Sequence, residues 1–149
     1  MKKILLLVTF LFALLLSACA QSTATEENLP TVPPPAAGMT SVTGRVIHKN
    51  TNDPFPNTIL RLAEVVRSDT GDDVYILDHA FSPGVKTNEK GIFLFENVDP
   101  IEYVIVVGNV ENLYEIIPKE DGKPRVWMTY ADEVLDVGDL KVLLEPTQP

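Results

Sequence analysis

Short runs of alternating apolar and polar residues dominate the chain from Thr40 onward. These runs are rich in Val, Ile, Leu, Phe and Tyr, and Gly, Pro, Asn or Asp separates one run from the next. This pattern predicts short β-strands joined by turns, and no segment has the apolar period of a helix. The expected strands are Ser41–His48, Thr58–Val66, Val74–Asp78, Ile92–Glu96, Tyr103–Gly108, Tyr114–Ile117, Arg125–Tyr130 and Val137–Leu144.

The alternation also predicts which side chains face the core, because successive residues of a strand point to opposite faces of the sheet. The expected core positions are Val42, Gly44, Val46, Leu60, Leu62, Phe93, Phe95, Leu140, Val142 and Leu144. The segment from Tyr103 to Val107 is apolar at every position, which favours a central strand over an edge strand. We therefore predict an all-β fold, a single sandwich of about seven to eight strands.

The first residues of the chain lack this alternation. Lys2 and Lys3 precede an apolar run from Ile4 to Leu16, and small residues follow the run. The run is shorter than the roughly 20 apolar residues that a membrane-spanning helix needs. We therefore interpret residues 1–18 as an export signal rather than as a spanning anchor.

Leu16, Ser17, Ala18 and Cys19 stand directly after the apolar run. They resemble the lipobox of bacterial lipoproteins, and the resemblance implies that Cys19 receives a diacylglycerol and becomes the first mature residue. Cys19 is the only cysteine, so it cannot form an intramolecular disulfide, and lipidation explains its presence. We expect an extracytoplasmic protein, anchored through this lipid to the cell membrane or to the outer membrane.

Residues 19–39 differ in composition from the strands that follow. Gln, Ser, Thr, Glu and Ala predominate there, together with Pro30, Pro33, Pro34 and Pro35. Such proline-rich segments favour an extended conformation of about 3.1 Å per residue. We predict that residues 19–39 are the lipidated cysteine and a flexible linker, and that residues 40–149 are one domain.

Several motifs of the predicted domain follow one another in a recognisable order. They are Val42-Thr43-Gly44-Arg45-Val46, then Asp53-Pro54-Phe55-Pro56-Asn57, then Thr87-Asn88-Glu89-Lys90-Gly91-Ile92-Phe93, and finally a strand that Tyr103 begins. This order resembles the carboxypeptidase regulatory-like family, whose fold is an Ig-like or prealbumin-like sandwich. The chain departs from the family at Glu102, where glycine is common, and in a long insertion at Ser68–Asp78. The motifs are packing motifs, and the resemblance implies no substrate.

Two glycines of these motifs have expected structural roles. Gly44 should let a neighbouring backbone or ring approach closely. Gly91 should adopt the positive φ of a tight hairpin.

Charge and the small number of reactive side chains narrow the function. The formal net charge is −9, which argues against nucleic acid as a partner. His48 and His79 are the only histidines and lie outside any zinc-binding motif, and no Gly-x-Ser-x-Gly sequence is present. The Tyr-Arg-Gly-Ser signature of the hydroxyisourate hydrolases, which share the sandwich, is also missing. We predict no catalytic residue, no cofactor and no enzymatic activity.

Two groups of residues are candidates for ligand contact. Asp69, Asp72 and Asp73 could offer oxygen ligands to Ca²⁺, although a solvated turn explains them more simply. A sugar could stack on Trp127, Tyr130 and Tyr114, although aromatic side chains are more often buried in a core.

These observations favour a lipid-anchored cell-envelope protein whose sandwich has a structural or protein-interaction role. The expected partners are the membrane, through the lipid on Cys19, and an envelope protein. A surface glycan-binding module is the alternative.

Overall fold

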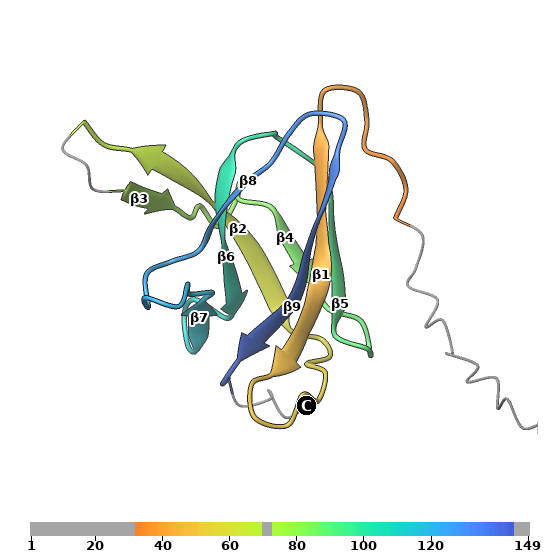
Figure 1. Ribbon diagram of the computed structural model, residues 1–149, viewed down its shortest axis with the longest axis vertical. Helices are drawn as coiled ribbons and strands as arrows, with labels where there is room; N and C mark the ends of the chain where they lie inside the picture. Colours follow the sequence, from red (N-terminus) through yellow and green to blue (C-terminus); the bar gives the residue numbers. More distant parts are fainter. Residues whose placement is uncertain (1–31, 70–72, 145–149) are drawn as a thin grey trace, which may run out of the picture. The chain divides into compact units, whose positions relative to one another are not determined.

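The computed structural model describes residues 32–69 and 73–144 (Figure 1). Regular structure in these two ranges consists of β-strands, and neither range contains a helix that could cross a bilayer. The nine strands are β1 (Thr40–His48), β2 (Ile59–Arg67), β3 (Asp73–Ile76), β4 (Gly84–Lys86), β5 (Ile92–Val98), β6 (Glu102–Gly108), β7 (Tyr114–Ile116), β8 (Val126–Met128) and β9 (Val134–Val142). The prediction of an all-β sandwich is confirmed.

The strands form two sheets. The smaller sheet has the order β5-β1-β9, in which β1 is antiparallel to β5 and parallel to β9. The larger sheet has the order β3-β2-β6-β7, and β4 and β8 pair with β2 and β6. All of its pairings are antiparallel.

Each edge of the larger sheet is formed by two short strands instead of one long strand. Strands β3 and β4 pair with opposite ends of β2, on the edge that β6 leaves free. Strands β7 and β8 divide the free edge of β6 in the same way. The nine strands therefore fill seven positions, three in the smaller sheet and four in the larger. Strand β4 was not predicted, because its three residues Gly84-Val85-Lys86 contain a single apolar side chain.

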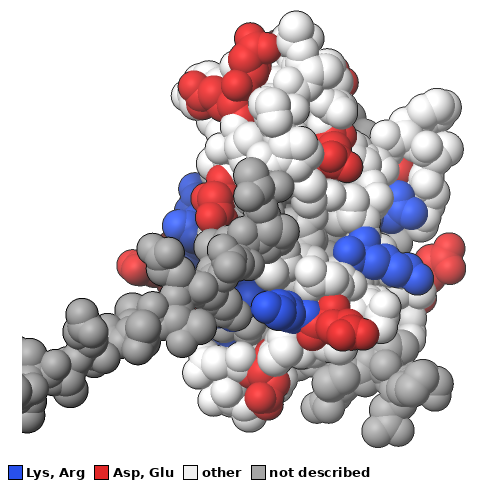
Figure 2. All heavy atoms as spheres, turned by 90° about the vertical axis from the view of Figure 1, so that its right-hand side faces the viewer, with Lys and Arg blue, Asp and Glu red and all other residues white. Residues whose placement is uncertain are grey.

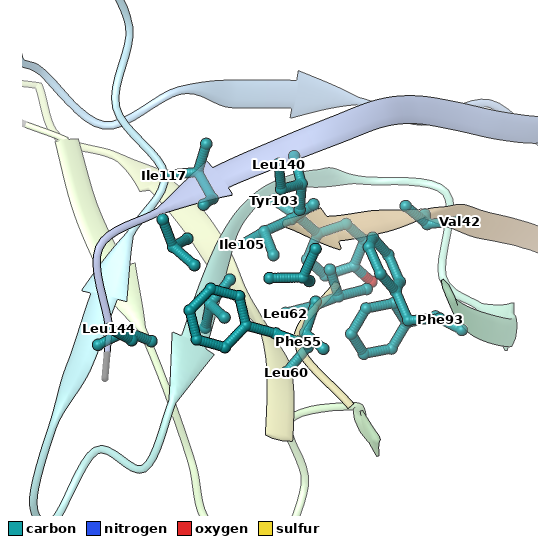
Figure 3. Packing of buried hydrophobic residues seen from close by; sticks show 14 of the residues in the cluster. Val42, Phe55, Leu60, Leu62, Phe93, Tyr103, Ile105, Ile117, Leu140 and Leu144 are labelled. Atoms are coloured by element: carbon teal, nitrogen blue, oxygen red, sulfur yellow. The ribbon is translucent and has the colours of Figure 1, made fainter. Parts of the chain in front are cut away.

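The main core lies between the two sheets (Figure 3). Every core position predicted from the alternation is buried, and Phe93 and Phe95 pack edge to face with ring centroids 5.8 Å apart. Strand β6 lies between β2 and the β7–β8 edge, and its residues from Tyr103 to Val107 are all buried. The prediction of a central strand there is confirmed.

Both glycine predictions are also confirmed. A Cβ at Gly44 would lie 2.7 Å from Val137 Cγ2 and 3.0 Å from Phe93 Cζ, so a side chain there would clash with the neighbouring strands β9 and β5. Gly91 has φ of 76°, in the turn that leads into β5.

The end of the predicted linker lies on the domain. The amide of Ala36 donates to Asn97 Oδ1 at 2.7 Å, and the amide of Gly38 donates to Asp132 Oδ1 at 2.8 Å. Residues 32–39 belong to the same compact unit as the sandwich. The chain thus enters the domain beside the first residue of β1, at the upper end in Figure 1.

Candidate functional site

The proposed lipidation site lies outside the described residues. This holds for Cys19 and for the lipobox residues Leu16, Ser17 and Ala18. Lipid attachment therefore stays a prediction.

Of the three aromatic candidates for sugar stacking, Tyr114 lies apart from Trp127. Trp127 pairs with Tyr103 at the beginning of β6, and Tyr114 pairs with Gly108 at its end, five residues or about 17 Å away. Trp127 is half-buried against the main core, with the Arg125 guanidinium 5.6 Å from the centre of its ring. Tyr130 and Tyr114 are 59% and 48% exposed. The fold does not assemble the three rings into one platform.

The acidic candidates for Ca²⁺ lie at the turn between β2 and β3. Asp69 is exposed, Asp73 is paired with Arg67, and Asp72 lies outside the described residues. Nowhere in residues 32–69 and 73–144 do three His, Cys, Asp or Glu side chains form a group suited to a metal ion. His48 stacks on Phe55 and His79 is exposed in a loop.

The most distinctive surface is formed by Glu64–Arg67 of β2 and Asp73–Ile76 of β3, which we call the arm. Figure 1 shows the two strands extending away from the sandwich. On the side of β2 that faces the other sheet, Leu60 and Leu62 are buried, but Val66 is 38% exposed. Val74 pairs with Val66 on the same side and is 50% exposed, and Ile76 is 46% exposed. The arm therefore presents three β-branched side chains to solvent.

Side chains on the opposite side of the arm contact residues of β6, the next strand of the larger sheet. Val65 of β2 is buried with Ala63, Val104 and Val106, and Tyr75 packs against this second cluster. Arg67 donates to Glu102 Oε1 and Oε2 at 2.7 and 2.9 Å, and to Asp73 Oδ2 at 2.6 Å. These bonds, first to Glu102 and then to Asp73, raise the pKa of Arg67 further above its ordinary value. They connect both strands of the arm to β6.

A cavity of about 340 Å³ lies at the other end of the sandwich, where β1, β6 and β9 finish. Its apolar walls come from Phe55, Ile59, Leu113 and Leu144. The remaining lining residues are Asn57, Thr58, Lys86, Gly108, Asn109 and Asn112. The sequence analysis did not identify this site, although the asparagine pair in the loop after β6 was a visible signal.

Two further titratable groups are perturbed. Burial, followed by the carboxylates of Asp99 and Glu64, raises the pKa of Tyr103 to about 12, and the phenol donates to the carbonyl of Asp99 at 3.0 Å. Arg45 hydrogen-bonds Asp139 across β1 and β9, which lowers the pKa of Asp139. On the side of the domain seen in Figure 2, acidic and basic side chains lie interspersed, without a patch of one sign.

No protein-family model matches the chain, and no curated protein matches it. The resemblance to the carboxypeptidase regulatory-like family therefore stays a prediction.

Several solved structures are similar in fold. A proposed carbohydrate-binding protein of Pseudomonas aeruginosa is 12% identical over 77% of this chain and 100% of its own, with a TM-score of 0.45. A DUF3823 family protein from Bacteroides uniformis is 15% identical over 70% of this chain and 43% of its own, with a TM-score of 0.42. The major pilin subunit of Bacillus cereus is 9% identical over 69% of this chain and 29% of its own, also with a TM-score of 0.42. This chain spans less than half the length of the last two, and similarity at this level concerns the arrangement of strands alone.

Proposed function

We propose that this chain is a lipid-anchored protein of the cell envelope, and that its sandwich is a non-catalytic module that binds another protein through the arm. The observation that carries the proposal is the exposure of Val66, Val74 and Ile76 on one side of a braced, projecting hairpin. Exposed apolar side chains that lie together are typical of protein-interaction surfaces.

The backbone of the arm suits an extended partner. Strand β3 is the last strand of its sheet, so the edge that faces away from β2 has no neighbour among the described strands. A partner segment in extended conformation can add to such an edge through main-chain hydrogen bonds. Its alternate side chains would then lie beside Val74 and Ile76, which supply the apolar contact.

The charges around the arm indicate which side chains the partner carries. Glu64 lies on the same side as Val66 and Ile76, and Asp69 is exposed next to the turn. The chain as a whole has a net charge of −9. We therefore expect an extended partner segment in which apolar residues alternate and basic residues flank them.

The anchor completes the proposal. The lipobox-like residues end at Cys19, and the predicted linker of residues 19–39 connects the expected lipid to the sandwich. A diacylglycerol together with an amino-terminal acyl chain would provide the two or more chains that stable attachment needs.

Site-specific photo-crosslinking of the full-length chain in intact cells tests the arm. A photoreactive residue at Val74 should give a discrete crosslinked protein, and a second substitution, Val66→Glu, should abolish that crosslink. Phe81 supplies the matched control, because it is 87% exposed outside the arm. Equal crosslinks from Val74 and Phe81, or a crosslink that survives Val66→Glu, would refute binding through the arm.

The anchor is tested separately with Cys19→Ser. The variant should accumulate as an unprocessed precursor and should incorporate no labelled fatty acid, whereas the unaltered chain is processed and labelled. Normal processing and labelling of Cys19→Ser would refute lipidation at this residue.

A further inference from the structure

The cavity at the end of the sandwich has hydrogen-bonding groups that the fold itself does not use. Within the described part of the chain, the side chains of Asn57, Asn112 and Lys86 form no hydrogen bond or ion pair. Asn109 uses only its side-chain oxygen, which accepts from the amide of Glu111 at 3.0 Å. Three amide groups and one ammonium group around a single cavity are therefore available to a ligand.

The amide and ammonium groups of the cavity indicate which chemical groups a ligand would carry. A side-chain amide offers a donor and an acceptor together, which matches a hydroxyl group, itself a donor and an acceptor. Lys86 is the only cation of the lining, and the lining contains no acid, although acidic residues outnumber basic ones in the chain. A lysine ammonium forms strong, charge-assisted hydrogen bonds with an anionic group such as a carboxylate.

The apolar part of the lining and its size add a further restriction. Ile59, Leu113 and Leu144 offer a surface on which the C–H face of a sugar ring can rest. A volume of about 340 Å³ is near the lower end of the roughly 300–1,000 Å³ typical of small-molecule sites. The cavity thus accommodates one ring rather than a long oligosaccharide.

The cavity lies at the end of the sandwich opposite the point at which the chain enters the domain. The chain enters the domain at the start of β1, whereas the cavity lies where β1 ends. A strand of nine residues separates these ends by about 30 Å. A ligand in the cavity therefore lies about one strand length from the point at which residues 32–39 join β1.

We propose that this cavity binds a single carboxylate-bearing sugar residue, such as a uronic acid at the end of a glycan. Lys86 holds the carboxylate, and Asn57, Asn109 and Asn112 hold the ring hydroxyls. This site is separate from the arm and from the aromatic side chains Trp127 and Tyr130.

Titration of the ¹⁵N-labelled full-length chain in detergent micelles tests the proposal by nuclear magnetic resonance. The probes are methyl glucuronide, methyl glucoside and acetate. Methyl glucuronide should shift the amide signals of Gly108, Asn109 and Asn112 saturably, and methyl glucoside should do so with an affinity about tenfold lower. Acetate should shift these signals only weakly, because it lacks the hydroxyl groups.

Matched variants locate the binding. Lys86→Ala should lower the affinity for the glucuronide about tenfold and leave the glucoside unchanged, whereas Asn112→Ala should weaken both sugars. Lys119→Ala and Asn50→Ala remove exposed residues outside the lining and should change neither.

Three results would overturn the proposal: no saturable shift with the glucuronide, equal affinities for glucuronide and acetate, or an affinity that Lys86→Ala does not change. The titration involves neither the lipid nor the arm, so its failure would leave the proposed function standing.

Discussion

One side of β2 has opposite environments in the two halves of the strand. In the first half, Leu60 and Leu62 face the smaller sheet and are buried. In the second half, Val66 lies on the same side of the strand but faces solvent, because the smaller sheet does not reach that far. An apolar residue in an alternating strand therefore contributes to the core only where a second sheet covers it.

The two halves of β2 therefore have different roles, one in stability and the other in the proposed binding of a partner. Burial of the first half stabilises the sandwich, whereas the exposed side chains of the second half contribute little to stability and remain available to a partner. On the opposite side of the second half, Arg67 forms ion pairs with Asp73 of β3 and Glu102 of β6.

The largest effect is expected at the covered half of β2. Leu62→Ala should lower the free energy of unfolding by about 2–5 kcal/mol, because it leaves a cavity between the sheets. Urea unfolding followed by the fluorescence of Trp127, the only tryptophan, would measure the loss. A loss below that of the matched change in the arm would contradict the comparison.

A smaller effect is expected in β6, which pairs with β2 from Leu60 to Glu64 in the larger sheet. Tyr103→Phe removes the hydrogen bond to the carbonyl of Asp99 and should cost about 1 kcal/mol near pH 7. The pKa of Tyr103 is raised to about 12 in the folded state from 10.0, so the folded state retains the proton more strongly. The stability that this provides is present below pH 10 and is lost as the pH rises toward 12.

The pH dependence distinguishes this role of Tyr103 from simple packing. The free energy of unfolding should fall less steeply between pH 9 and pH 12 in Tyr103→Phe than in the unaltered chain. Parallel decline in the two proteins would show that the phenol does not titrate as described.

The bracing of the arm should have a weak global effect and a clear local one. Arg67→Gln removes the pairs to Glu102 and Asp73, which are partly exposed, so global stability should change little. Hydrogen exchange of the amides of β3 should accelerate, while exchange in β1 stays unchanged. Unchanged exchange in β3 would mean that these ion pairs do not hold the arm.

The smallest effect on stability is expected at the exposed half of β2. Val66→Ala should change the free energy of unfolding by less than about 0.5 kcal/mol, since solvent already reaches the side chain. The same urea measurement as for Leu62→Ala provides the direct comparison. A loss of several kcal/mol would show that the side chain of Val66 is covered in solution.

Much of the fold could be predicted from the residues alone. The alternation from Val42 to Val46 and from Leu140 to Leu144 identified the faces of β1 and β9 correctly, because a period of two residues follows from strand geometry. The close approach of neighbouring groups at Gly44 was also predicted, because a residue without a side chain stands there between the core residues Val42 and Val46. Strand β4 was not predicted, because Gly84–Lys86 shows no alternation of its own and is recognised as a strand by its pairing with β2.

The candidate sites could not be predicted from local sequence patterns. Trp127 and Tyr114 are near one another in the sequence, yet the interruption of the outer strand places them at opposite ends of β6. The cavity joins Asn57, Lys86 and Asn112, which come from three separate segments of the chain. No local pattern connects these residues.

The sequence by itself determined the class of fold, the composition of the core and the presence of a lipobox-like cysteine, because each of these depends on residues within one short segment. Only the tertiary structure decided that the end of β2 leaves the sandwich and that four polar side chains meet at one cavity. The physical reason is that exposure depends on what lies opposite a residue, and that partner comes from a distant part of the chain.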